Sequence, residues 1–138
     1  MSRLVRFGVS LEKDLLNKFD RLIRSKNYPN RSEAFRDLIR QELIAKEWKE
    51  SGRIAGAIIL IYDHHRRELV NKLLDIQHDF QNLTISTQHI HLDHNNCLEI
   101  IAIKGSSKEA QRLTDMLKSV KGIKHAKLSM STTGKDIE

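Results

Sequence analysis

The sequence LTISTQHIHLDHNNCLEIIAIK, residues 83–104, contains two apolar stretches on either side of a short polar turn. Residues 83–92 and residues 97–104 are predicted strands, and the turn at residues 93–96 joins them into a hairpin. Gly105 follows directly, and we expect it to end the hairpin.

The segments around this hairpin indicate the rest of a domain. Residues 54–62 are mostly apolar, which predicts a buried strand, and apolar residues at helical spacing predict a helix over residues 66–80. Beyond the hairpin, the pattern predicts a helix over residues 107–120 and a last strand over residues 123–130. The order β-α-β-β-α-β is that of an α+β, ferredoxin-like sheet with helices on one face.

The N-terminal part has a different pattern. Residues 3–10 alternate between apolar and polar or small side chains, which predicts a short strand. A first helix is predicted over residues 12–25, and a second one starts at Asn30, has Glu33 at the capping-box position and ends at Gly52. This βαα unit has too little core to be stable alone, so we expect two copies to pair their strands and intertwine their helices.

Two such strands form an antiparallel ribbon, which fits the major groove of DNA. With the apolar side of the strand against the helices, Arg6, Gly8 and Ser10 face the base edges, where arginine can form two hydrogen bonds to guanine. Asn30-Arg31-Ser32 starts the second helix, and its free backbone N–H groups would bind a DNA phosphate. The alternative is a pair of dimerisation helices in which the strand has no role.

Charge and histidine content differ between the two parts of the chain. The 138 residues have a formal net charge of +6, of which residues 1–52 carry +4 and residues 53–138 carry +2. All seven histidines lie in the second part. We expect a DNA-binding domain over residues 1–50, a metal-binding domain over residues 53–131 and a frayed tail at residues 132–138.

The sequence also predicts a cellular compartment. Its N-terminal residues lack the apolar segment of a signal peptide, and no apolar run approaches the roughly 20 residues that span a bilayer. The single cysteine, Cys97, cannot form an internal disulfide. These features predict a cytoplasmic protein with no membrane partner.

A metal site is predicted at the hairpin. His89 and His91 are two residues apart on a strand, so their side chains point to the same face. Cys97 follows across the turn, and a His/His/Cys set suits nickel, copper or zinc. His78, near the end of the preceding helix, is the candidate fourth ligand. A regular four-residue turn would pair Leu92 with Cys97, so this site requires an irregular strand start at Cys97.

The other histidines have different predicted roles. His64 and His65 follow Tyr62-Asp63 and are candidates for a weaker second site. His94 lies in the turn and is predicted to face solvent, whereas His125 is predicted to be structural. A buried, inert cysteine and hydrogen-bonded histidines are the alternatives to metal binding.

Residues 3–50 resemble a ribbon-helix-helix domain. The similarity rests on Arg6-Phe7-Gly8-Val9-Ser10-Leu11 in the strand and on Asn30-Arg31-Ser32-Glu33-Ala34-Phe35-Arg36-Asp37 in the second helix. Gly8 departs from the pattern, because this position often carries a polar side chain such as threonine. The departure implies that one direct base contact is missing.

Gln77-His78, followed by residues 89–99 (HIHLDHNNCLE), resembles the signature of NikR nickel-responsive regulators, whose C-terminal domain is of the ferredoxin-like ACT type. This resemblance implies square-planar Ni(II) bound by His89, His91 and Cys97 of one subunit and His78 of a neighbouring subunit. It also implies a homotetramer, a dimer of dimers with four ACT domains in the middle.

The same resemblance assigns further residues by position. Glu99 matches a residue that supports the metal site, and Tyr62 and His64 match positions near it. Glu33 and Asp37 match a secondary cation position between domains.

The resemblance implies repression of nickel-uptake genes when nickel is plentiful. We expect nickel to order residues 62–80, so that Arg66 and Arg67 contact the DNA backbone while Arg6 and Ser10 read bases. Two ribbons on one tetramer would require a double-stranded operator with two half-sites.

Two other functions are considered. In the first, the ACT domain of a ribbon-helix-helix regulator senses a small metabolite, and the histidines are incidental. In the second, the His/His/Cys site performs hydrolysis, which needs an open coordination position and a general base. No additional acid/base pair stands out in the sequence, so we expect a regulator and not an enzyme.

Overall fold

The structure is a computed structural model that describes residues 3–50 and 52–137. It forms two compact units, the first ending at Leu43 and the second running from Ile44 to Asp136. Each unit is described separately below.

The first unit contains helix α1 (Lys13–Ser25) and most of helix α2 (Arg31–Lys49). The two helices pack through Phe19 and Phe35, whose ring centroids are 5.2 Å apart. The N-cap predicted at Asn30 is confirmed, because its side-chain oxygen accepts a hydrogen bond of 2.9 Å from the backbone N–H of Glu33. Both helices therefore begin within two residues of their predicted starts.

The strand predicted over residues 3–10 does not form in the single chain, where this segment has no regular secondary structure. Its side chains are strongly exposed, with Val5 at 78% and Phe7 at 75% of full exposure. A strand exists only as part of a hydrogen-bonded ladder. The predicted ladder requires the strand of a second chain, so one chain alone cannot complete it.

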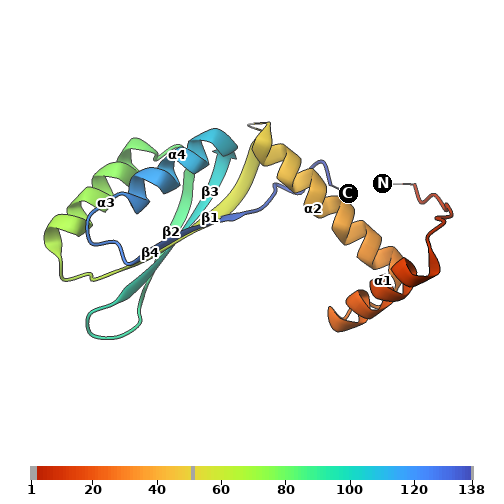
Figure 1. The fold of residues 1–138 in the computed structure, drawn as a ribbon. Coiled ribbons are helices and arrows are strands. Elements are labelled where there is room, and N and C mark those ends of the chain that lie inside the picture. The colour runs from red at the N-terminus through yellow and green to blue at the C-terminus, as the bar shows by residue number, and fades with distance from the viewer. Residues whose placement is uncertain (1–2, 51, 138) are drawn as a thin grey trace. The chain divides into compact units, whose positions relative to one another are not determined.

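The second unit is a four-stranded antiparallel sheet in the order β2-β3-β1-β4, with two helices. Figure 1 shows both helices on the same side of the sheet, which confirms the predicted ferredoxin-like arrangement. The elements along the chain are β1 (Arg53–Tyr62), α3 (Arg67–Asp79), β2 (Thr84–His91), β3 (Cys97–Ser106), α4 (Ser107–Lys118) and β4 (His125–Met130).

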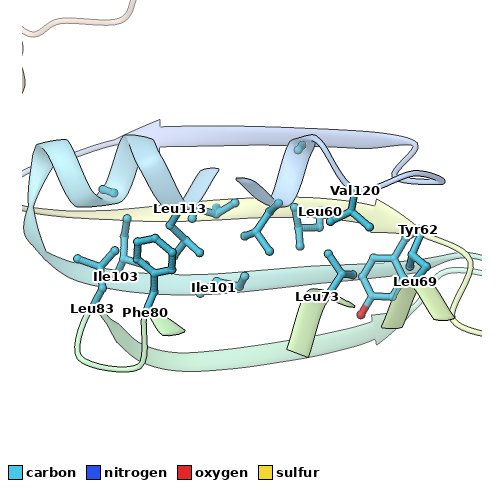
Figure 2. Close-up of a cluster of buried hydrophobic side chains, with 14 of the residues drawn as sticks. Leu60, Tyr62, Leu69, Leu73, Phe80, Leu83, Ile101, Ile103, Leu113 and Val120 are labelled. Atoms are coloured by element: carbon cyan, nitrogen blue, oxygen red, sulfur yellow. The ribbon is translucent and has the colours of Figure 1, made fainter. Parts of the chain in front are cut away.

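The core of this unit lies between the sheet and its two helices. Alternate residues of β3, from Cys97 to Ile103, are buried, so one face of the strand points into the core. Figure 2 shows Tyr62 beside Leu69 and Leu73 at one end of the core, and Phe80 with other apolar side chains at the opposite end.

The pairing of β2 with β3 stops at Ile103 and Lys104, so the hairpin ends just before Gly105 as predicted. The strand β3 itself continues through Gly105, which pairs with Ile54 of β1. The Gly105 φ of +153° is unfavourable for residues with a side chain, and a Cβ there would lie 2.6 Å from Leu83 Cδ1. The glycine therefore allows Leu83 to pack closely against the strand while the ladder continues.

Within the described parts of the chain, none of the helices combines the length and apolar character required to cross a bilayer.

Candidate metal centre

The ladder between β2 and β3 pairs His91 with Cys97 and His89 with Glu99. The pairing of Leu92 with Cys97 that a regular four-residue turn would give does not occur. The reason is the loop, which has five residues rather than four and is closed by a 2.9 Å hydrogen bond from Leu92 N to Asn96 O. Because directly paired residues point to the same face, Cys97 reaches the histidine face without an irregular strand start.

Strand β1, on the other side of β3, extends these pairs into rows across the sheet. Tyr62 pairs with Cys97 on the other side, so Tyr62, Cys97 and His91 form one row across three strands. Cys97 and Tyr62 are buried in the middle of the sheet, whereas His91 is exposed because β2 is an edge strand. The row therefore extends from the core to an accessible edge.

Glu99 is the centre of a hydrogen-bond network in the neighbouring row. Although 98% buried, its carboxylate accepts 2.8 Å hydrogen bonds from Tyr62 Oη at Oε1 and from Gln77 Nε2 at Oε2. His89 Nδ1 lies 3.2 Å from Oε1. These partners satisfy both oxygens of a buried carboxylate, which would be costly to leave unpaired.

This network determines what His89 can do. When His89 Nδ1 carries the proton, its N–H donates a hydrogen bond to Glu99 and the lone pair of the ring is on Nε2. Carboxylate–histidine pairs of this kind support metal ligands. The pKa of Tyr62 is raised well above its usual value, first by burial and then by the hydrogen bond to Glu99. Tyr62 therefore remains a neutral donor to the carboxylate.

Sequence reasoning gave no role to Gln77, which the structure places in this network. The only sequence feature that could have indicated this role is the position of Gln77 next to His78. Gln77 lies on α3 and Glu99 on β3, so their hydrogen bond connects the helix that carries His78 to the strand that carries Cys97.

His78 is exposed in the last turn of α3. Within the chain regions described here, it has no side-chain hydrogen bond to His89, His91 or Cys97, and the donor atoms of these three are not all within 4.8 Å of one another. The donor set nevertheless fits a borderline metal such as Ni(II), with two imidazoles, one thiol and a buried carboxylate that orients one imidazole.

His64 lies against the metal-site row. Its ring stacks on His91 with a centroid distance of 4.5 Å and an interplanar angle of 8°. Burial, followed by the nearby charges of His65 and His91, lowers the pKa of His64. His94 is exposed, as predicted, whereas the structural role predicted for His125 is not supported because its side chain is also exposed.

The predicted DNA-binding residues have different environments. Arg6, Gly8 and Ser10 are exposed in the N-terminal segment. The guanidinium of Arg31 instead binds Asp20 of α1, with hydrogen bonds of 2.9 and 2.8 Å. The Arg31 hydrogen bond lowers the pKa of Asp20.

The start of α2 retains part of its predicted anion-binding capacity. The Asn30 side chain occupies the N–H of Glu33, whereas the N–H groups of Arg31 and Ser32 are in the first turn and have no carbonyl partner inside the helix. These two groups remain suited to a phosphate.

The other predicted residues are placed as follows. Arg66 and Arg67 line a hollow of about 410 Å³ at the start of α3, together with Lys72 and Lys121. Glu33 forms an ion pair with Arg36, and Asp37 accepts hydrogen bonds from Tyr28 and Gln41. Both carboxylates thus have partners within the described residues, and the secondary cation position stays a prediction.

Comparisons with known proteins agree with this architecture. Residues 5–46 match the family of ribbon-helix-helix proteins of the copG type, and residues 55–131 match the NikR C-terminal nickel-binding domain. A DNA-binding ribbon-helix-helix domain followed by a metal-binding domain defines a class of metal-responsive transcription regulators. The chain belongs to the NikR family of nickel-responsive regulators; it is not an enzyme, and its cofactor is Ni(II).

Similar proteins support the same assignment over almost the whole chain. A protein of Syntrophus aciditrophicus named "Putative nickel-responsive regulator" is 60% identical over 134 residues, which are 97% of this chain and 98% of the relative. A protein of Chlorobium limicola with the same name is 59% identical over 97% of this chain and 100% of its own length. An uncharacterized protein of Thermotoga maritima, whose structure has been solved, covers 56% of this chain and 96% of its own, with a TM-score of 0.52 and 11% identity, so it shows similarity of fold alone.

Proposed function

We propose that this regulator is a repressor of nickel-uptake genes that binds its operator when His89, His91 and Cys97 hold Ni(II). The observation that supports this proposal best is the row of His91, Cys97 and Tyr62 next to the row of His89 and Glu99. The rows place two imidazoles and a thiol on one face of the sheet, with a buried carboxylate in hydrogen-bonding range of one imidazole.

We propose that His78 of a neighbouring subunit completes the site. His78 is exposed and lies on a different element from the other three ligands, which favours a role between chains. Bound Ni(II) would supply the link between the two subunits, as part of a homotetramer built from two ribbon-helix-helix dimers. The Gln77–Glu99 hydrogen bond would hold α3 of each subunit in a fixed position relative to its own His89.

The DNA contacts follow from the ribbon. Arg6 and Ser10 of the two paired strands would read bases, with Gly8 between them making no side-chain contact. The first turn of α2, at Arg31 and Ser32, would bind a phosphate through backbone N–H groups. Arg66 and Arg67 would add phosphate contacts at the start of α3, on an operator with two half-sites.

The experiment is a gel-shift titration on a nickel-transporter promoter, with and without Ni(II). We compare the wild type with Cys97→Ala and use His125→Ala as the control, because His125 is exposed and outside the cluster. We expect Ni(II) to strengthen binding for the wild type and the control only. Circular dichroism checks that each variant is folded, and the thiolate-to-nickel absorption band reports whether the site is filled.

Equal binding by the wild type and Cys97→Ala, with and without Ni(II), would disprove the sensing function. If the wild type binds DNA equally with and without Ni(II) but shows the normal absorption band, the protein has a nickel site that does not control DNA binding.

A further inference from the structure

A groove of about 870 Å³ lies between the end of α2, the length of α4 and the edge strand β4. All of its lining residues belong to the second unit, which begins at Ile44. The volume is within the range of about 300–1,000 Å³ that is usual for small-molecule sites. None of the proposed nickel ligands lines the groove, so a ligand bound here would be independent of the metal.

Trp48 forms one wall of the groove and is held in place by its surroundings. Its indole Nε1 donates a 2.8 Å hydrogen bond to the backbone carbonyl of Ser131, and its own carbonyl accepts one of 3.0 Å from Ser107 Oγ. The ring also packs close to Gly56, where a Cβ would lie 3.4 Å from Trp48 Cζ2. This wall is therefore ordered before any ligand binds, which lowers the entropic cost of binding.

The rest of the apolar lining is accessible and adaptable. Ala45, Met116 and Met130 line the groove together with Trp48. Met130 is 53% exposed and Met116 is half-buried, so a ligand would cover apolar surface that is open to water in the single chain. Methionine side chains are flexible and make favourable contacts with varied apolar groups. This lining favours a ligand with a large apolar body.

The polar side chains of the lining that carry no positive charge already have partners. The hydroxyl groups of Ser107 and Ser119 donate to backbone carbonyls. The single acid of the lining, Asp115, accepts a 3.3 Å hydrogen bond from Gln111 Nε2. An uncharged polar group of a ligand would therefore find few free partners here.

Three exposed cations complete the lining: Lys49, Lys108 and Arg112. The two lysines form no ion pair with any acidic side chain that the structure describes. They directly follow Trp48 and Ser107, which are joined by a hydrogen bond, so both ammonium groups belong to the same end of the groove. This end therefore favours a negatively charged group.

We propose that this groove binds a small carboxylate with a large apolar body, the class to which medium-chain fatty acids belong. The carboxylate would lie at Lys49 and Lys108, and the apolar body against Trp48 and the two methionines. A second copy of the chain is a poorer occupant, because two such grooves facing each other would bring their cations together. A DNA strand is also poorer, because a polyanion would leave the apolar lining uncovered.

The test uses the fluorescence of Trp48, which is the only tryptophan in the chain. The full-length protein is titrated at low salt with octanoate, with octanol, which lacks the charge, and with acetate, which lacks the apolar body. Lys108→Glu is compared with the control Lys118→Glu, because Lys118 is an exposed lysine of the same helix that does not line the groove. Circular dichroism checks that both variants are folded.

We expect octanoate to shift the Trp48 emission with the same dissociation constant in the wild type and Lys118→Glu. Lys108→Glu should bind octanoate about five- to tenfold more weakly, since charge reversal replaces an attraction with a repulsion. Octanol should bind all three proteins equally, and acetate should cause no shift.

The absence of any octanoate-induced shift in the wild type would overturn the proposal. So would equal octanoate affinity in the two variants, or an equal loss of octanol and octanoate affinity in Lys108→Glu, because neither result is compatible with recognition of the carboxylate. Sedimentation equilibrium is run on the same proteins. If octanoate does not bind and Lys108→Glu changes the state of association, the groove is an interface between copies of the chain and the proposal is wrong.

Discussion

His91 lies directly opposite Cys97 in the ladder between β2 and β3, so the two side chains leave the sheet on the same face. The proposed site spans two neighbouring pairs, because His89 lies opposite the buried Glu99 in the same way. A loop shorter by one residue would shift the register and move Cys97 to the other face. The length of the five-residue loop between His91 and Cys97 therefore brings the proposed ligands to one face.

Glu99 is expected to set the nickel affinity through His89. In Glu99→Gln, the shape of the side chain is retained but the charge that holds the His89 N–H is lost. We expect nickel affinity to fall by about 10- to 100-fold, the usual effect of removing such a supporting group. Competition with a chelator of known affinity measures this change.

Glu68→Gln is the matched control for this variant, because Glu68 is an exposed glutamate on α3. Unfolding curves without metal show whether Glu99→Gln is folded. Unchanged affinity in a folded Glu99→Gln variant would show that the carboxylate does not support His89.

Phe7 is expected to hold two chains together. It is 75% exposed in one chain, within the segment that lacks a partner strand. If a second chain covers it, Phe7→Asp removes about 1.5–3 kcal/mol of apolar burial per side chain, which corresponds to dimerisation weakened at least about tenfold. Sedimentation equilibrium over a dilution series measures the dissociation constant.

Arg6→Ala is the control for Phe7→Asp, since Arg6 lies on the opposite face of the predicted strand. We expect its dissociation constant to equal that of the wild type. A Phe7→Asp variant that associates as strongly as the wild type would disprove the ribbon in this form.

Arg6 and Arg31 are expected to differ in their effect on DNA binding. Arg6→Ala removes a side chain that reads bases, so we expect a loss of about 1–3 kcal/mol in preference for the operator over random DNA. Arg31→Ala retains the backbone N–H proposed to bind phosphate, and its side chain is tied to Asp20, so we expect binding close to wild type. Fluorescence anisotropy with both DNAs compares the variants, and an Arg31→Ala loss as large as that of Arg6→Ala would reverse the assignment.

Asp93 is expected to make the β2–β3 loop sensitive to acid. Hydrogen bonds from the Asn96 side chain, and then from the backbone N–H groups of Asn95 and Asn96, lower the pKa of Asp93 from its usual value of 3.8. A lowered pKa in the folded state means that the charged carboxylate stabilises the fold above its ordinary pKa, and that this contribution is lost as pH falls through the folded value.

Urea unfolding of the metal-free protein tests this sign. We expect the stability difference between the wild type and Asp93→Asn to be constant near neutrality and to shrink from about pH 4 downwards. A difference that stays constant down to about pH 2 would show that Asp93 does not titrate with folding.

Local pattern was sufficient for the secondary structure of the second unit. All four of its strands and both helices were predicted within a few residues, because each apolar period reports directly which face an element buries. The same reasoning placed His89 and His91 on one face, because a strand directs alternate residues to the same side. It proposed Cys97 as a third ligand only because that residue follows across a short turn.

Local pattern did not determine the register of the β2–β3 ladder, the close packing of Leu83 against Gly105 or the hydrogen-bond partners of Glu99. These depend on contacts between segments far apart in the chain, such as Leu83 against Gly105 and Gln77 against Glu99. The spacing of residues along the chain does not predict how close a helix and a strand come when other residues pack between them.

The sequence by itself determined the order of elements, the two kinds of domain and the side chains able to bind a metal, since these follow from residue type and local period. Only the tertiary structure decided that a five-residue loop brings Cys97 opposite His91, and that a buried Glu99 holds the ring of His89. The physical reason is that hydrogen bonds across a sheet fix register, whereas hydrophobic period fixes only the face. The strand predicted over residues 3–10 is a second example of this limit. Its apolar period indicates which face is buried, but the strand can pair only with a second chain.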